Sequence, residues 1–338
     1  MKNIVTVIVL VFIAAVISGT CMAQEKTYRI EVLQVTDNSP FDYCFSGFLK
    51  ELESNGLNEG KNLKINRRVI DFDLEKAGLW KKIGVLMRIR KEASDIVKEK
   101  PDLVLTIGTP ATKYAKEKII AAGIPLVFTA VAIPETAGCK SLSVAGPGFT
   151  GSTLYMDIND FLRIVHLAFP KKSTFGIIHS GENNTMAQIE RLKKEGGPMG
   201  MRFITKEVSK SDSIIPAARE LIAQGTEVFL LPMDSYYGVR KNQACTELSV
   251  ETLAHRIPAI SMMHVKVPDA VLYVGSDFTY IGSLAGRNVV SILKEGVSPD
   301  HLPILRQDDL SIMVDVKRLK ELKIELPLEI LQLAKAYK

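Results

Sequence analysis

Short apolar segments alternate with longer amphipathic segments along most of this 338-residue chain. The apolar segments are typical of strands buried in a parallel sheet, and the longer segments repeat their apolar residues at helical spacing. This alternation predicts an α/β fold with parallel sheets covered by helices on both faces. The expected strands cover 28–35, 63–70, 103–107, 126–129, 174–179, 202–208, 228–231, 259–262, 270–274 and 311–314. The expected helices cover 40–55, 75–99, 110–122, 157–168, 185–195, 212–224, 237–255 and 278–295.

Two stretches of the chain, 28–140 and 174–262, carry similar series of strands and helices. The chain is also longer than the ~100–200 residues usual for one domain, so we expect two lobes of the same architecture. The stretch 144–151 between them is rich in glycine and proline and is the best candidate for a linker. The composition, 46% hydrophobic and 24% charged, is that of an ordinary globular protein.

The N-terminus has the pattern of a secretory signal peptide, with a basic start, an apolar run over 4–17 and a small-residue cleavage site. We expect residues 1–23 to be removed, so that the mature protein is soluble, begins at Gln24 and lies in the periplasm. Two alternatives remain open. An uncleaved anchor is disfavoured because the run is shorter than the ~20 residues that span a bilayer. A lipoprotein acylated at Cys21 would instead begin at that residue.

Three cysteines remain after the signal peptide, Cys44, Cys139 and Cys245. An odd number cannot pair completely. An oxidising compartment would permit a bridge between Cys44 and Cys139, which both fall in the expected first lobe, but buried free thiols are the favoured alternative. The basic surplus, 43 Lys and Arg against 38 Asp and Glu, is dispersed and indicates no nucleic-acid partner.

The candidate site lies where strands meet helices, because ligands of open parallel sheets bind at the carboxyl ends of the strands. Several such turns carry polar or small residues. The candidate ligand-binding residues are Asp37, Asn38, Ser39, Gly108, Thr109 and Pro110 in the first lobe, Glu182, Asn184, Thr185, Asp234, Ser235 and Tyr236 in the second, and Asp277 after a later strand.

The turn Gly108-Thr109-Pro110 has the clearest physical basis. Glycine allows the backbone to approach a ligand, proline suits the first helical position, and the free N–H groups of the helix start attract a carboxylate or phosphate. Asp277 would take a cationic or hydroxyl group. The alternative for each of these residues is an ordinary helix cap. Phe128, Tyr236 or Tyr237 could supply an apolar or stacking wall.

Motifs for catalysis are missing from the sequence. The spacing Gly-x-Gly-x-x-Gly occurs at 146–151, but it contains Pro147 and falls in the expected linker, so it is not taken as a nucleotide site. There is no phosphate-binding P-loop, and the five histidines are not spaced for a metal. No acid, base and nucleophile can be combined into one site. We therefore expect a binding protein without cofactor or metal rather than an enzyme.

Several segments in order resemble the ABC transporter substrate-binding protein family that includes tryptophan and phenylalanine receptors. These segments are 47–62, 100–104, 108–111, 124–131, 275–282 and 314–327, of which 124–131, with the further candidate residues Thr129 and Ala130, is the most specific. The chain departs from the family where Ser180-Gly181 replaces a frequent Asn-Pro and where no Asp-Pro follows residue 131. The resemblance therefore does not identify the ligand of this chain.

The resemblance implies two Rossmann-like lobes of the periplasmic-binding-protein type I kind, joined by three crossover strands that let them close over a ligand. By this resemblance the first lobe is 27–147 plus 265–302 and the second is 149–263 plus 303–338. It implies a monomer that captures a small molecule, an amino acid or similar solute, for an ABC permease and ATPase. The alternative is a receptor that presents its closed form to a membrane signalling partner.

Overall fold

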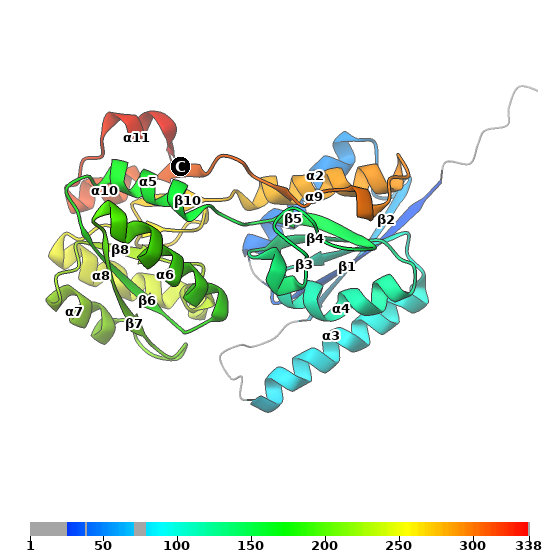
Figure 1. Ribbon diagram of the computed structural model, residues 1–338, viewed down its shortest axis with the longest axis horizontal. Helices are drawn as coiled ribbons and strands as arrows, with labels where there is room; N and C mark the ends of the chain where they lie inside the picture. The colour runs from blue at the N-terminus through cyan, green and yellow to red at the C-terminus, as the bar shows by residue number, and fades with distance from the viewer. Residues whose placement is uncertain (1–25, 38, 71–78, 337–338) are drawn as a thin grey trace, which may run out of the picture.

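The computed structural model describes residues 26–37, 39–70 and 79–336, which form two lobes side by side (Figure 1). The first lobe has a fully parallel sheet of six strands in the order β11-β5-β4-β3-β1-β2. Its strands are β1 (Tyr28–Val35), β2 (Leu63–Ile70), β3 (Leu103–Ile107), β4 (Leu126–Val131), β5 (Phe149–Thr153) and β11 (Leu305–Arg306).

The second lobe has a sheet of seven strands in the order β13-β12-β10-β9-β8-β6-β7. Its strands are β6 (Thr174–His179), β7 (Arg202–Glu207), β8 (Val228–Leu231), β9 (Ala259–Ser261), β10 (Leu272–Gly275), β12 (Ser311–Val314) and β13 (Lys335–Ala336). Within this sheet β12 is antiparallel to β10, whereas the other pairs are parallel. In both sheets the second strand lies at one edge, the first strand is next, and the third strand follows on the other side, which confirms two lobes of one architecture.

Helices cover both faces of the first sheet and enclose a separate core on each face. They are α2 (Ser39–Ser54) and α9 (Phe278–Leu293) on one face, and α3 (Leu79–Glu99) and α4 (Thr109–Ala121) on the other. The helices α2 and α9 pack so closely that a Cβ on Gly282 would lie 1.8 Å from the Cys44 carbonyl oxygen. The predicted helix over 75–99 is described only from Leu79 onward.

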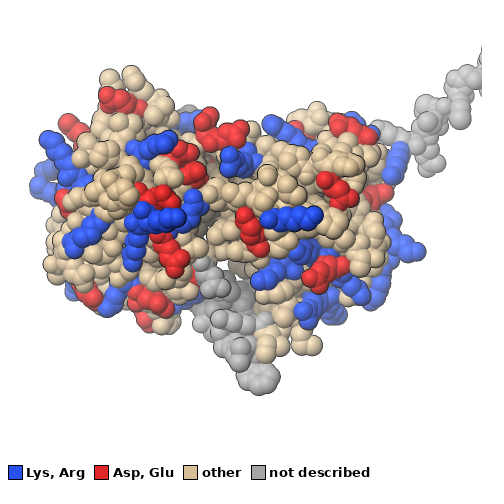
Figure 2. All heavy atoms as spheres, viewed as in Figure 1, with Lys and Arg blue, Asp and Glu red and all other residues tan. Residues whose placement is uncertain are grey.

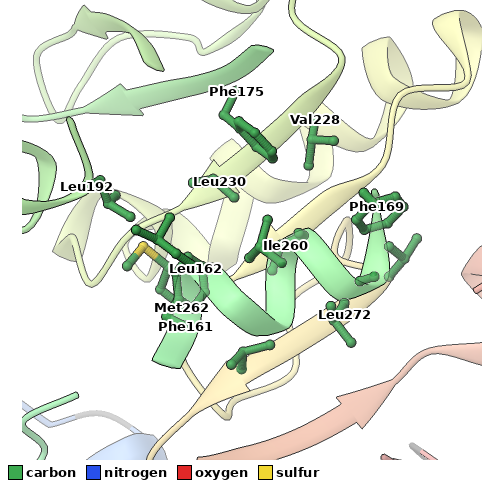
Figure 3. Close-up of a cluster of buried hydrophobic side chains, with 14 of the residues drawn as sticks. Phe161, Leu162, Phe169, Phe175, Leu192, Val228, Leu230, Ile260, Met262 and Leu272 are labelled. Carbon is green, nitrogen blue, oxygen red and sulfur yellow. The ribbon is translucent and has the colours of Figure 1, made fainter. Parts of the chain in front are cut away.

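The second lobe has the same layered arrangement. Its core helices are α5 (Ile158–Ala168), α6 (Asn183–Gly196), α10 (Val316–Leu322) and α11 (Leu328–Leu333) on one face and α7 (Ile215–Ala223) and α8 (Gln243–His255) on the other. Figure 3 shows Phe161 and Leu162 of α5 packed against apolar side chains of the sheet. Short 3-10 helices complete the fold: η2 (Pro134–Ala137), η3 (Gly197–Met199), η4 (Ser235–Tyr237), η5 (Arg240–Asn242) and η6 (Pro299–His301).

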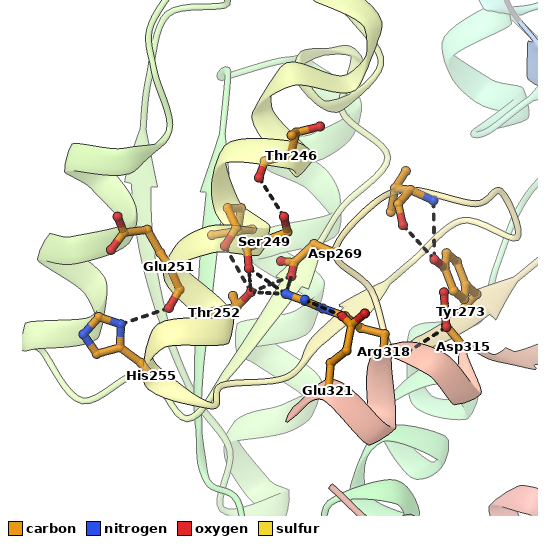
Figure 4. A network of polar contacts seen from close by, with 12 residues as sticks. Thr246, Ser249, Glu251, Thr252, His255, Asp269, Tyr273, Asp315, Arg318 and Glu321 are labelled. Atoms are coloured by element: carbon orange, nitrogen blue, oxygen red, sulfur yellow. Dashed lines mark hydrogen bonds and ion pairs between the residues drawn. The ribbon is translucent and has the colours of Figure 1, made fainter. Parts of the chain in front are cut away.

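The helix α10 is fastened to the second lobe by a buried ion pair between Arg318 and Asp269 (Figure 4). Their side chains are 8% and 0% exposed, and Thr252 donates a hydrogen bond of 2.6 Å to the same Asp269 oxygen. Arg318 also donates to the Ser249 carbonyl at 2.7 Å. Burial raises the pKa of Asp269 to about 6. This network ties the C-terminal part of the chain to α8 and to the loop between β9 and β10.

The chain passes between the lobes three times, at 154–157, at 276–277 and at 307–310. Side chains tie these crossovers together. The Ser276 hydroxyl donates to the Leu154 carbonyl at 3.5 Å, and the Gln307 side-chain oxygen accepts the Asp277 N–H at 2.8 Å. The family resemblance predicted three crossovers between the lobes, and the structure has them; their role as a hinge stays a prediction.

The prediction of a linker over 144–151 was wrong, because β5 begins at Phe149 and is buried in the first sheet. Gly146 and Gly148 have φ of 150° and 76° and turn the chain into that strand. Residue 151 of this strand must be glycine, because a Cβ there would lie 2.3 Å from the Phe128 carbonyl oxygen.

The sheet pairing also differs from the predicted lobe bounds at three strands. It places β5 and β11 in the first lobe and β10 in the second, so each crossover lies later along the chain than predicted, the second one by about twelve residues. The remaining bounds of the two lobes stay predictions.

Other sequence predictions concern the termini and the cysteines. The predicted signal peptide and Cys21 lie outside the described residues. No helix in the described part of the chain is long and apolar enough to cross a membrane. Cys44, Cys139 and Cys245 are buried free thiols, as favoured from the sequence, and burial raises the pKa of Cys44 to about 12.

Candidate ligand-binding cleft

A cleft of about 1200 Å³ separates the lobes and is lined from both sides. On the face shown in Figure 2 the molecule narrows between its lobes, and acidic and basic side chains are interspersed. Lining residues from the first lobe include Thr36, Asp37, Pro40, Phe41, Thr109, Pro110, Lys113, Tyr114 and Ala130. Those from the second lobe include Glu182, Asn184, Met233, Asp234, Ser235, Gly238 and Val239.

The sheet topology explains why these turns meet at the cleft. In each sheet the strand order reverses between the first and third strands, β1 and β3 in one lobe and β6 and β8 in the other. Crevices at such a reversal, outside the carboxyl ends of the strands, are where open α/β sheets bind ligands. The cleft is lined by the turns after all four strands, at Asp37, Thr109, Glu182 and Asp234.

Three neighbouring strands of the first lobe each have a residue with a positive φ at or just after their carboxyl end. Thr36 after β1 has φ of 78°, Gly108 after β3 has φ of 88°, and Ala130 near the end of β4 has φ of 56°. This conformation is routine for glycine but costly for threonine and alanine. Strained backbone of this kind is often found at ligand sites. Thr36 and Ala130 both line the cleft.

The N-terminus of α4 is an uncapped helix end beside the cleft. Its N-cap residue is Gly108, no side chain caps it, and Pro110 is in the first turn. Thr109 and Pro110 line the cleft, so the free N–H groups and the positive end of the helix dipole are available to an anion. The Phe41 ring packs on Gly108, where a Cβ would lie 2.9 Å from it, which explains the need for glycine.

Two carboxylates of the second lobe that line the cleft already hold protein groups. Asp234 accepts hydrogen bonds from the Ser180 N–H at 2.8 Å, the Ser180 hydroxyl at 2.7 Å and the Tyr236 N–H at 2.9 Å. Glu182 accepts from the Ser235 hydroxyl and from Lys210, each at 2.5 Å. These bonds fix the turns after β6 and β8 to each other.

Asp37 differs from these carboxylates. It is exposed, and within the described part of the chain it has no hydrogen-bond or ion-pair partner. Asn184, at the start of α6, likewise has no side-chain hydrogen bond to the described residues. Both side chains therefore remain available to a ligand in the cleft.

Of the fifteen candidate residues from the sequence, eight line the cleft: Asp37, Thr109, Pro110, Ala130, Glu182, Asn184, Asp234 and Ser235. Asn38 lies outside the described residues. Ser39 and Gly108 start helices beside the cleft without lining it.

Four further candidates face the protein interior or a helix end. Thr129 is buried and accepts the Ser152 hydroxyl at 3.0 Å, and Thr185 is buried and donates to the Met233 carbonyl at 3.2 Å. Tyr236 is fully buried and donates to the Asp212 carbonyl, and burial raises its pKa to about 12. The Asp277 carboxylate accepts the Thr279 N–H at 2.8 Å and therefore caps α9, the alternative considered from the sequence.

The apolar part of the cleft differs from the predicted one. Phe128, Tyr236 and Tyr237 belong to the cores of the lobes, so they offer no wall to a ligand. The aromatic lining comes from Phe41, Tyr114 and Phe278 instead.

Sequence reasoning also missed Lys113, Lys116 and Glu117, which follow Thr109 along the cleft-facing side of α4. Their spacing of four, seven and eight residues from Thr109 is the signal that could have found them. Among the described residues no group of three His, Cys, Asp or Glu could hold a metal ion.

The chain matches the model of the ABC transporter substrate-binding protein family over residues 29–338 and belongs to that family. Its members are solute-binding proteins and not enzymes, which confirms the prediction of a binding protein. A curated relative, the tyrosine-binding protein of Clostridioides difficile strain R20291, is 26% identical over 304 residues, which cover 89% of this chain and 82% of the relative.

Solved structures share the fold. The ligand-free, open structure of a substrate-binding protein with adhesive properties from Clostridium difficile is 24% identical, with a TM-score of 0.74 over 92% of this chain and 99% of that one. An ABC domain in complex with L-Trp from Streptococcus pneumonia is 20% identical, with a TM-score of 0.73 and the same coverage. These similarities confirm the predicted fold, two parallel-sheet lobes of the type I periplasmic binding proteins.

Proposed function

We propose that this protein binds an α-amino acid with an aromatic or apolar side chain in the cleft between its lobes. The observation that carries the proposal is a complementary pair of groups at the strand reversal of the first lobe. The uncapped start of α4 at Thr109 suits a carboxylate, and the unpartnered Asp37 suits an ammonium group. The aromatic residues Phe41, Tyr114 and Phe278 line the same cleft and suit an apolar side chain.

The second lobe completes the site when the lobes close. The cleft volume of about 1200 Å³ is larger than the ~300–1000 Å³ usual for small-molecule pockets, so a small solute cannot fill it in this arrangement. Closure at the three crossovers would bring Asn184 and Ser235 onto the ligand. Ligand then stabilises the closed form because only that form makes contacts from both lobes.

The relatives support the same ligand class. One curated relative is named a tyrosine-binding protein, and one structural neighbour was solved with L-Trp. Family membership supports delivery of the ligand to an ABC permease and ATPase by an exported monomer. Export with cleavage before Gln24 predicts that mass spectrometry of the native protein finds that residue at the N-terminus. A diacylglycerol-modified Cys21 would instead favour the lipoprotein.

A thermal-shift comparison tests the ligand class. L-tyrosine and L-tryptophan should stabilise the protein, and a ligand at 100 times its Kd adds ~2.7 kcal/mol of stability. Tyramine, which lacks the carboxylate, and 4-hydroxyphenylpropionate, which lacks the ammonium group, should stabilise it far less. Equal stabilisation by all of these compounds would contradict recognition of both charged groups. Stabilisation only by sugars or nucleosides would show that the proposed ligand class is wrong.

A further inference from the structure

The left-handed residue Thr36, at the end of β1, is held by a side chain that does not line the cleft. Gln34 is completely buried in the sheet, and its amide nitrogen donates a hydrogen bond of 2.8 Å to the Thr36 carbonyl oxygen. On the other side, the Thr36 N–H donates to the Ile70 carbonyl of β2 at 3.2 Å. Both backbone groups of this strained residue are therefore fixed from within the first lobe.

The orientation of the Gln34 amide is set by Arg67 of the edge strand β2. Arg67 donates two hydrogen bonds to the Gln34 side-chain oxygen, at 3.1 Å from Nε and 2.6 Å from Nη2. A guanidinium has donors only, so the atom that faces it must be the oxygen and the amide nitrogen must face Thr36. Arg67 is itself held by Asp42 at 2.7 Å and by the Phe45 ring, 4.5 Å from its guanidinium.

We propose that Gln34, oriented by Arg67, is a positioning residue that holds Thr36 in the left-handed conformation and so directs Asp37 into the cleft. The inference rests on the proposed function, which assigns Asp37 to the ammonium group of the ligand. A threonine disfavours this backbone region. Without the hydrogen bond from Gln34, the left-handed conformer of Thr36, which is the one that binds ligand, therefore becomes a minor population. The apparent Kd then rises in inverse proportion to that population.

The variant Gln34→Glu tests the hydrogen bond to Thr36 with little change of shape. Its carboxylate still accepts from Arg67 but has no hydrogen to donate to the Thr36 carbonyl. We expect the Kd for L-tyrosine, measured by calorimetry, to rise about tenfold, which corresponds to ~1.4 kcal/mol. In the ligand-free protein, hydrogen exchange at the Thr36 and Asp37 amides should become faster.

A second substitution separates positioning from general damage to the sheet. Glycine adopts the left-handed region without strain. Gln34→Glu should therefore raise the Kd much less in the Thr36→Gly background than in the wild type, whatever Thr36→Gly alone does to the Kd. Thr36→Asn, which also tolerates this region, should reduce the effect of Gln34→Glu in the same direction.

Asn66 provides the matched control, because it belongs to the same pair of strands and donates to Glu31 without contacting Gln34 or Thr36. Asn66→Ala should leave both the Kd and the exchange at residues 36–37 unchanged. Unchanged Kd and exchange in Gln34→Glu would overturn the inference, as would a rise in the Kd that is equally large in the Thr36→Gly background. If the wild type does not bind L-tyrosine, the proposed ligand class fails, and the exchange measurements alone decide the role of Gln34.

Discussion

At the scale of single residues, the carboxylates near the cleft differ in what their oxygens already bind. Asp234 and Glu182 hold the turns of the second lobe together, and Asp277 caps α9. Asp37 has no partner in the described part of the chain. The charge available to a ligand therefore depends on hydrogen bonds made inside the protein and not on the presence of an acid at a strand end.

The variants Asp37→Asn and Asp277→Ala should have opposite effects. Asp37→Asn removes the charge for the ligand ammonium, so the Kd for L-tyrosine should rise by about tenfold or more, ~1.4 kcal/mol, with little change in the melting temperature. Asp277→Ala removes a helix cap, so the free energy of unfolding should fall by ~1 kcal/mol while the Kd holds. Calorimetry measures the Kd and urea unfolding measures the free energy of unfolding. A raised Kd in Asp277→Ala would show that Asp277 contacts the ligand.

The buried pair of Arg318 and Asp269 predicts a dependence of stability on pH. Burial raises the pKa of Asp269 to about 6, above its ordinary value of 3.8, so the folded state binds the proton more tightly than the unfolded state. The contribution of this group to stability is therefore largest at low pH and is lost as pH rises from 3.8 to about 6.

The variant Arg318→Met leaves Asp269 buried without its cation. At pH 7 it should lose ~3–5 kcal/mol of unfolding free energy. The loss should shrink at pH 5, where the carboxyl becomes protonated and neutral, and urea unfolding at the two pH values measures this. The double variant Asp269→Asn, Arg318→Met should lose less at pH 7. An equal loss for Arg318→Met at both pH values would show that the pair acts through packing alone.

The sequence was sufficient to locate each strand-to-helix turn. It was not sufficient to predict which side chains of a turn point into the cleft and which point into the protein interior. Thr109 lines the cleft from the turn after β3, whereas Thr129, which the sequence placed at the end of a strand, lies within β4 with its side chain in the interior. In a turn the side-chain alternation of the strand is lost, and the backbone angle decides the direction. The left-handed angle of Thr36 and Ala130 depends on tertiary contacts, so their sequence could not predict it.

At the scale of elements, the strands that alternate with helices along the sequence were the most predictable part of the fold. The predicted bounds of β1, β2, β3, β6, β8 and β12 agree with the structure. The strand β5 was missed because Gly151, together with Gly146 and Gly148 before the strand, resembles a linker in sequence, although close packing requires Gly151. The two-residue strands β11 and β13 and the short helices α10 and α11 are too short to show a periodicity, and tertiary contacts determine them.

The contact between α2 and α9 predicts a large effect of one methyl group. A Cβ on Gly282 would lie 1.8 Å from the Cys44 carbonyl oxygen, so Gly282→Ala must push the helices apart. Overpacking costs typically ~1–3 kcal/mol, and this backbone contact should place the loss at or above the upper end. Gly84→Ala in α3 is the control. No atom lies within 4 Å of its Cβ position, so the variant should gain up to ~1 kcal/mol in urea unfolding. Equal stability of the two variants would contradict the packing described.

At the scale of the whole molecule, each lobe has its own sheet and its own cores, and the crossovers are the covalent connections between them. The family resemblance and the alternation of strands and helices together predicted this arrangement. The lobe bounds could not be placed to the residue, because a crossover strand has the same local pattern whichever sheet it joins.

Small-angle X-ray scattering with and without L-tyrosine tests the central claim, that a ligand binds between the lobes and closes them. Saturating ligand should reduce the radius of gyration of the wild type, because closure brings the two lobes together over the cleft. Asp37→Asn at the same ligand concentration should remain in the open form if that concentration lies below its Kd. An unchanged radius for the wild type at saturation, with binding confirmed by calorimetry on the same sample, would contradict closure of the lobes over the ligand.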